Sequence, residues 1–268
     1  MTKEMKIPKD HPRAESLSVR EKLLEHYKMG AVAHAGLIAH GRGEAFDYLL
    51  GEKTTKSALE AIKAAAAALL TAKHPVISVN GNAAALVADD IVKLSGVTGA
   101  RIEVNLFHRS VEREKAIERV LKDAGATKVL GIGENASARI QEIGSERRRV
   151  DPNGILIADA VLVPLEDGDR TEALVRMGKK VIAIDLNPLS RTAQLATVTI
   201  VDDIVRAMPT LAKIAEGLKT EDQEKLKDIA SEFDNKRNLG DAIDLIKQRL
   251  TELAEKGTYI SLLEMSRI

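Results

Sequence analysis

Short apolar runs alternate with amphipathic segments through the middle of the chain. Residues 181–184 are four apolar side chains between charged neighbours, which is typical of a strand buried on both faces of a parallel sheet. Similar runs predict strands at residues 74–79, 101–104, 127–130, 160–163 and 197–201. Helices between consecutive strands imply right-handed βαβ units. The pattern therefore predicts an α/β fold with a parallel sheet.

Helices are predicted from amphipathic or alanine-rich spacing. The N-terminal ones cover residues 12–29, ended by Gly30, and residues 54–71, capped by Thr54 or Thr55. Those between strands cover residues 83–94, 110–124 and 169–177, a piece opening at Asn187 and Pro188, and a piece capped by Asp202 or Asp203. Two charged helices follow, 221–233 and 239–255. We interpret the chain as one α/β domain, residues 1–268, with an N-terminal helical segment (1–72), a core (73–217) and C-terminal helices (218–268).

Two segments allow more than one interpretation. In residues 40–44, glycines flank Arg42, so that backbone and guanidinium could approach an anionic ligand; the alternative is a plain turn between helices. Residues 144–159 begin polar and have Pro152 as a turn signal, which predicts an exposed excursion. The three arginines 147–149 in it are expected to form a solvated face, with phosphate binding as the minority interpretation.

Composition narrows the classes of function. Forty basic residues balance forty acidic ones in 268 residues, which argues against a general nucleic-acid binder. Because the chain has no cysteine, disulfides, thiolate zinc sites and thiol nucleophiles are excluded. No stretch approaches a membrane span, and the charged first residues do not resemble a secretory signal. We therefore expect a cytoplasmic protein with no nucleic-acid or membrane partner.

Polar residues follow several of the predicted strands. They form three groups: Asn80, Gly81 and Asn82; residues 105–109 with His108 and Arg109; and the glycine-rich residues 131–135. A glycine between two asparagines at a helix start exposes N–H groups to a phosphate or carboxylate, and a His/Arg pair also suits an anion. Each group could instead be ordinary turn chemistry. Together they predict an anionic small-molecule site at one edge of the sheet.

A second set of polar residues follows the strands at 181–184 and 197–201. In a parallel sheet, Asp185, Asn187, Arg191, Thr192 and Asp203 could line one crevice at the carboxyl ends. Carboxylates and an amide suit ribose hydroxyls or a base edge, and arginine suits phosphate. The alternative is that these residues are only caps and turns. No metal-ligand spacing, P-loop, GxSxG or dinucleotide GxGxxG is present in the sequence, so metal ligation is not predicted.

Four strings are more specific than these general signals: HGRGEAFDYLLGE (40–52), SVNGNAAAL (78–86), EVNLFHRSVER (103–113) and IDLNPLSRTAQ (184–194). With them, the chain resembles the archaeal phosphopantothenate synthetase, or 4-phosphopantoate–β-alanine ligase, family over essentially its whole length. The resemblance implies a cytoplasmic homodimer with a Rossmann-like, doubly wound core. It also implies a carbon–nitrogen ligase of coenzyme A biosynthesis that uses Mg²⁺ and ATP, forms an acyl-adenylate, and releases AMP and diphosphate.

The resemblance also implies the ATP contacts, which are Arg20, Arg42, Asp185, Leu186, Asn187, Arg191, Thr192, Asp203 and Ile204. For 4-phosphopantoate we predict Asn80, Gly81, Asn82, His108 and Arg109, because an amide-rich helix start and a His/Arg pair suit a dianion. The proposed chemistry depends on positioning and charge neutralisation and needs no nucleophilic side chain.

Two other functions are compatible with the same pattern. An NAD-dependent oxidoreductase would also place an acidic residue after a strand, although the missing GxGxxG argues against it. A nucleotide-binding sensor would bind ATP without turnover, with the terminal helices contacting a partner. Those helices could equally form a dimer interface or a cap over the site.

Overall fold

The computed structural model describes residues 13–165 and 167–257, and its centre is a five-stranded parallel sheet. The strands lie in the order β2-β1-β5-β6-β7. Their bounds are β1 Pro75–Val79, β2 Arg101–Val104, β5 Ala160–Pro164, β6 Lys180–Ile184 and β7 Val198–Ile200. The predicted α/β class and parallel sheet are confirmed. Counted along the chain the order is 2-1-3-4-5, which is a doubly wound order different from that of the dinucleotide-binding Rossmann fold.

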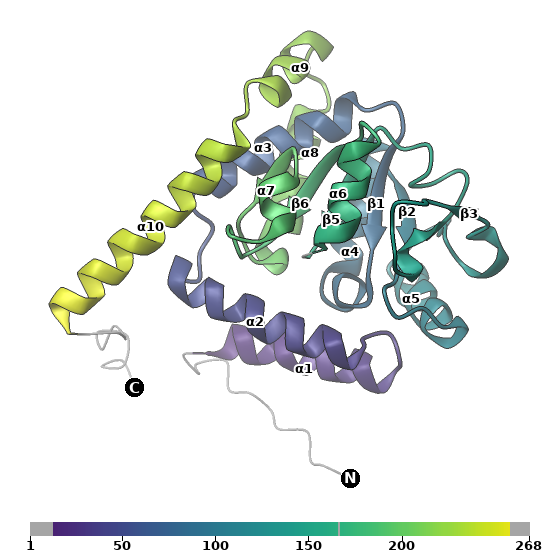
Figure 1. The fold of residues 1–268 in the computed structure, drawn as a ribbon, viewed down its shortest axis with the longest axis horizontal. Coiled ribbons are helices and arrows are strands. Elements are labelled where there is room, and N and C mark those ends of the chain that lie inside the picture. Colours follow the sequence, from purple (N-terminus) through teal and green to yellow (C-terminus); the bar gives the residue numbers. More distant parts are fainter. Residues whose placement is uncertain (1–12, 166, 258–268) are drawn as a thin grey trace.

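Alternate side chains of the strands point to two separate cores. Ile77, Leu162 and Ile182 belong to the core shared with helices α3 (Lys56–Thr71), α4 (Gly81–Thr98), α5 (Val111–Asp123) and α8 (Ile204–Leu218). Val161 and Val181 belong to the core on the opposite face, with α6 (Gly168–Arg176) and the segment 138–158. The sheet is thus covered on both faces (Figure 1), which explains why its strands are uniformly apolar.

Helices α1 (Ala14–Lys28) and α2 (His34–Leu50) pack against each other beside the sheet (Figure 1). The turn considered for residues 40–44 is wrong, because these residues lie inside the continuous helix α2. Elsewhere in α2, Gly36 allows close packing, because a Cβ added to it would lie 2.2 Å from Asn82 Oδ1. A Cβ added to Gly43 would lie 3.6 Å from Leu186, which is an ordinary contact distance.

Two other local predictions are corrected. Residues 127–130 form no full strand: only Leu130 bridges to Glu103, and the chain turns away at Gly131, whose φ is +76°. The segment 144–159 is not an exposed excursion, because it contains fully buried Val150 and Ile155 and packs on the sheet. It carries the 3-10 turn Glu146–Arg148 and the strand β4 (Arg149–Val150), which pairs with β3 (Ala138–Arg139).

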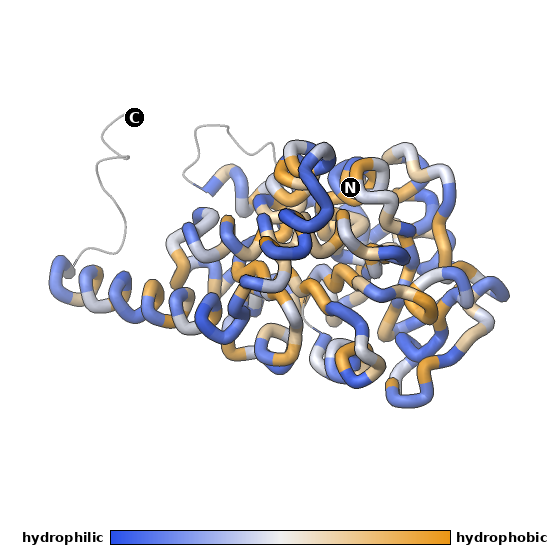
Figure 2. The backbone as a smooth tube through the Cα atoms, turned by 90° about the horizontal axis from the view of Figure 1, so that it is seen from above, coloured by the Kyte–Doolittle hydropathy of each residue, from blue (hydrophilic) through white to orange (hydrophobic). Residues whose placement is uncertain are grey.

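The remaining elements complete the C-terminal part. They are α7 (Arg191–Leu195), α9 (Gln223–Ser231) and α10 (Asn235–Lys256), with a short 3-10 turn at Gly133–Asn135. Helix α10 contacts α2, α3, α7 and β7, and it projects from the body (Figure 1). Seen from above, the projecting part is mostly hydrophilic with isolated apolar positions (Figure 2). No helix in the described parts of the chain is long and apolar enough to span a bilayer.

Candidate active site

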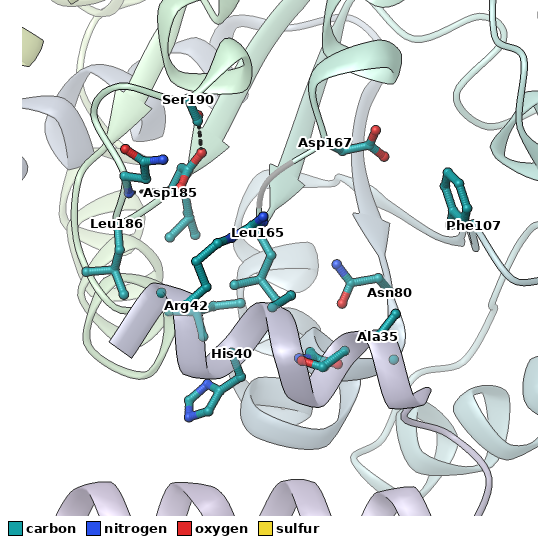
Figure 3. Close-up of a pocket in the computed structure, with 18 of the residues that line it drawn as sticks. Ala35, His40, Arg42, Asn80, Phe107, Leu165, Asp167, Asp185, Leu186 and Ser190 are labelled. Atoms are coloured by element: carbon teal, nitrogen blue, oxygen red, sulfur yellow. Dashed lines mark hydrogen bonds between the residues drawn. The ribbon is translucent and has the colours of Figure 1, made fainter. Parts of the chain in front are cut away.

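A cleft of about 610 Å³ opens at the carboxyl ends of the parallel strands and is bordered by α2. Figure 3 shows Asp185, Leu186 and Ser190 at one end and Asn80, Ala35 and Phe107 toward the other. The cleft lies where the strand order reverses between β1 and β5, the usual position of ligands in an open α/β sheet. Its volume is in the range of small-molecule sites.

The loop after β6 forms one wall and is held by its own side chains. The carboxylate of Asp185 accepts hydrogen bonds from the Asn187 N–H (3.0 Å) and from the Ser190 hydroxyl. Asn187 accepts from the Leu189 N–H (2.9 Å), and Ser190 caps α7. The predicted helix start at Asn187 is therefore wrong, since Asn187 closes a turn and the helix begins three residues after Pro188.

Two aspartates after β7 stand beside this wall. Asp203 caps α8 by accepting from the Val205 N–H (2.9 Å), as the sequence predicted. Asp202 accepts from the Thr54 hydroxyl (2.6 Å) and is paired with Arg206 (2.7 Å). Burial raises the pKa of both aspartates above the ordinary value. Asp203 thus offers the cleft a positioned carboxyl group for hydroxyl or amino donors.

All residues of the predicted ATP set except Arg20 and Thr192 line the cleft. Arg42 extends from α2 toward Leu165 (Figure 3), and Arg191 forms ion pairs with Asp169 (2.9 Å) and Glu172 (2.7 Å). Arg20 lies outside the cleft, where it is paired with Glu44 (2.8 Å).

Thr192 acts behind the cleft wall. Its side chain is fully buried, and its hydroxyl accepts from the N–H of Asp167 (2.7 Å), which lines the cleft. It thereby ties α7 to the loop before α6. The predicted ATP contacts of Arg20 and Thr192 stay predictions.

Asn80, Gly81, Asn82 and His108 line the opposite end of the cleft, as predicted for 4-phosphopantoate. Asn80 caps α4 by accepting from the Ala83 N–H (2.9 Å), while its amide donates to the Pro164 carbonyl (2.9 Å). Asn82 donates to the Gly36 carbonyl (2.8 Å), which holds α2 against the start of α4. The positive end of the α4 dipole therefore faces the cleft.

Arg109 does not line the cleft. Its side chain is 3% exposed and forms an ion pair with the equally buried Glu114 (2.7 Å). It also donates to the carbonyls of Gly131 (3.3 Å) and Arg149 (3.2 Å). These contacts join α5 to the segment 131–149. Substrate binding by Arg109 stays a prediction.

Sequence reasoning missed a charged cluster at the base of the cleft. Arg147 is 9% exposed, lines the cleft and is ion-paired with Asp167, which contradicts the predicted solvated face. Asp167 also pairs with the fully buried Arg170 (3.1 Å), which donates to Asn105 Oδ1 (2.9 Å). Burial, together with the charge of Arg147, lowers the pKa of Arg170 to about 9. The apolar residues near Arg147 in the sequence, such as Ile143 and Val150, were the available signal of its burial.

Leu165 lies in the loop between β5 and this charged cluster. It lines the cleft with φ of +69°, a conformation that a branched side chain rarely adopts. Its N–H donates to the Ile184 carbonyl (3.0 Å), which holds the loop against β6. Such backbone strain is concentrated at functional sites, and it here coincides with the point where the strand order reverses.

A cleft with arginines, carboxylates and a helix N-terminus at the carboxyl edge of a parallel sheet is typical of α/β proteins that bind small anionic molecules. Within the described residues, no group of three or more histidine, aspartate or glutamate side chains could hold a metal ion.

The model of the phosphopantothenate/pantothenate synthetase family matches residues 57–249, and the chain belongs to that family. Curated relatives named 4-phosphopantoate–β-alanine ligase are similar over nearly the full length. The protein of Methanosarcina mazei is 54% identical, covering 94% of this chain and 99% of its own. That of Thermococcus kodakarensis is 53% identical (94% and 97%), and that of Methanospirillum hungatei is 50% identical (93% and 100%).

Proposed function

We propose that this protein is an ATP-dependent ligase that joins 4-phosphopantoate to β-alanine. The products are 4′-phosphopantothenate, AMP and diphosphate, and the reaction belongs to coenzyme A biosynthesis. The single observation that carries the proposal is the family membership, with relatives of this activity at 50% identity or more over almost the whole chain. The cleft supports it, because its two ends differ in the chemistry that they offer.

ATP occupies the end formed by α2 and the loops after β6 and β7. Arg42 and Arg191 neutralise phosphate charge there, while the carboxylates of Asp185 and Asp203 accept from hydroxyl or amino groups. Asp185 and Asp203 would also be the oxygen ligands available to a Mg²⁺ ion bound with the nucleotide, which would neutralise phosphate charge. 4-Phosphopantoate occupies the end near Asn80 and His108.

The reaction has two steps in this arrangement. A carboxylate oxygen of phosphopantoate attacks the α-phosphorus of ATP, and diphosphate leaves. The amine of β-alanine then attacks the acyl carbon, and AMP leaves with the bonding electrons. Both steps depend on holding the reactants in line and on balancing negative charge, which the buried Arg147–Asp167–Arg170 cluster favours by fixing the base of the cleft.

The protein acts as a homodimer in this proposal. Ile243 and Leu250 are 41% and 45% exposed on the projecting helix α10. They are seven residues apart, so they lie on one face of the helix. Two exposed apolar side chains on one face of a helix that extends from the body support contact with a second copy of the chain there.

The activity is tested by incubating the protein with Mg-ATP, 4-phosphopantoate and β-alanine, omitting each in turn, and separating the nucleotides by chromatography. We expect AMP and diphosphate only with phosphopantoate, and an amide product once β-alanine is present. Formation of ADP would indicate an acyl-phosphate intermediate in place of the acyl-adenylate. No turnover would favour the nucleotide-binding sensor.

The placement of ATP is tested with Arg42→Ala. We expect the KM for ATP to rise about tenfold, corresponding to roughly 1.4 kcal/mol of lost phosphate binding, with a smaller effect on phosphopantoate. Arg20→Ala is the informative companion, because Arg20 lies outside the cleft. An unchanged ATP KM in Arg42→Ala would remove Arg42 from the ATP site.

A further inference from the structure

A second cavity of about 730 Å³ lies between the α1–α2 turn and the start of α5. It is bordered on its outer side by Tyr27, Lys28, Val32 and His34. Four residues, Ala33, Ala35, His108 and Arg113, line both this cavity and the main cleft. The two spaces therefore adjoin at the end of the main cleft proposed for phosphopantoate, near Ala35 in Figure 3.

The charged side chains that line the second cavity are basic. Lys28 and Arg113 line it together with two histidines, and none of the lining residues in the described parts of the chain is an aspartate or glutamate. A cavity of this composition accommodates an anion, and its volume exceeds what a small amino acid requires.

Arg113 is the charged group at the junction of the two spaces. It donates to the carbonyl oxygens of His108 and Ala31, the latter at 3.2 Å, and has no carboxylate partner in the described parts of the chain. Burial and the nearby cation Arg147 lower the pKa of Arg113, so its charged form is disfavoured where it stands. A carboxylate placed against the guanidinium would relieve that cost.

The order of the two reaction steps suggests a role for the second cavity. After the first step the main cleft holds the acyl-adenylate, and the third reactant must still reach the acyl carbon. An approach from the ATP end would pass the bound nucleotide. An approach through the second cavity leads directly to the phosphopantoate end, where the acyl carbon lies in the proposed arrangement.

We propose that the second cavity is the access route and binding site of β-alanine, with Arg113 as the receptor of its carboxylate. The inference rests on the proposed ligase function and assigns one of its substrates. The amine nitrogen forms the C–N bond while the C–O bond to AMP breaks. The two protons lost by the ammonium group, one before and one after attack, pass to water.

The receptor is tested with Arg113→Gln, with Arg119→Gln on the exposed face of the same helix as the matched control. The first step is measured alone as phosphopantoate-dependent ATP–diphosphate exchange without β-alanine. We expect Arg113→Gln to raise the KM for β-alanine at least about tenfold, as for a lost charge-assisted contact, with the KM for phosphopantoate in exchange within about twofold. Arg119→Gln should change neither.

A second readout separates carboxylate recognition from a general structural effect. Propylamine lacks the carboxylate of β-alanine but carries a comparable amine. The unmodified protein should strongly prefer β-alanine as the acyl acceptor, and Arg113→Gln should lose most of that preference. A variant that slows both amines equally would overturn the assignment.

The route is tested with Ala35→Met, which fills the junction from an exposed position of α2, and with Ile38→Met, which lies outside both cavities, as its control. We expect a higher KM for β-alanine only in Ala35→Met. Unchanged β-alanine kinetics in both Arg113→Gln and Ala35→Met, or a rise confined to the KM for phosphopantoate, would overturn the inference while leaving the ligase intact. Absence of phosphopantoate-dependent turnover in the unmodified protein would overturn both.

Discussion

The buried carboxyl group of Glu103 is held by backbone N–H groups of one turn. Glu103, in the middle of β2, is fully buried and accepts from the N–H groups of Asp151 (3.0 Å) and Ile155. A Cβ added to Gly154 would lie 1.8 Å from the Glu103 carboxylate, so only glycine fits there. Glu103 therefore holds the turn at residues 151–155 against the sheet.

The pH dependence of stability tests this arrangement. Burial raises the pKa of Glu103 from 4.5 to about 7, so the folded protein holds this proton more tightly than the unfolded chain. Its contribution is therefore most favourable below pH 4.5 and is lost as the pH rises through 7, by roughly 3 kcal/mol. In urea titrations, the free energy of unfolding of the unmodified protein should fall relative to Glu103→Gln between pH 4.5 and 8. A difference independent of pH would contradict the shifted pKa; Glu134→Gln, at an exposed position, is the control.

At the scale of elements, the active cleft depends on how α2 and the preceding turn approach the start of α4. Asn82 bonds the Gly36 carbonyl, and a Cβ added to Gly81 would lie 2.2 Å from the Ala31 carbonyl oxygen. These contacts leave no room for a side chain at Gly36 or Gly81. Small residues therefore serve a tertiary contact here, and the contact lies at the end of the cleft that we propose for phosphopantoate.

Two substitutions in one helix test that interpretation. Gly81→Ala must displace the Ala31 backbone, and we expect it to lower the free energy of unfolding by about 1–3 kcal/mol and to raise the KM for phosphopantoate. Gly96→Ala, also in α4, meets nothing within 4 Å, so it should raise the free energy of unfolding by about 0.5–1 kcal/mol. Chemical denaturation of both variants gives the comparison. Equal effects of the two changes would show that the close contact is unimportant.

At the scale of the whole molecule, helix α10 extends beyond the compact α/β body (Figures 1 and 2). Its first half is anchored, since Leu239 and Ala242 are buried in a small core with Leu50, Leu186 and Val201. That core links α10 to Leu186, in the loop at the end of the cleft that we propose for ATP. A dimer through the exposed face of α10 would therefore be connected through packed side chains to the proposed nucleotide site.

The assembly is tested by combining Ile243→Glu with Leu250→Glu. Sedimentation should show twice the monomer mass for the unmodified protein and the monomer mass for the double variant, because two charges would be buried in the interface. Leu59→Glu, at a similarly exposed position of α3, should remain dimeric. A double variant that stays dimeric would place the interface elsewhere.

Short-range pattern was sufficient for most elements and for part of the site. Alternation of apolar runs and amphipathic segments located all five strands of the sheet, and the polar residues after β6 and β7 indicated the crevice that Asp185 and Asp203 do line. The pattern was wrong at residues 40–44 and 127–130, where helix packing and a glycine of positive φ outweighed local propensity. The division into one domain with terminal segments stays a prediction.

The sequence by itself determined the α/β class, the family and the residues that could contact a nucleotide, because periodicity, capping residues and characteristic strings are local properties of the chain. Only the tertiary structure decided that Arg109 is buried in an ion pair and that Arg147 reaches the cleft. It also decided that Arg113 lies where two cavities adjoin, with no carboxylate partner among residues 13–165 and 167–257. The sequence does not distinguish one arginine from another, because the role of an arginine depends on which carboxylate and carbonyl groups lie near it in the fold. Those groups come from residues far apart along the chain, so no local sequence pattern contains this information.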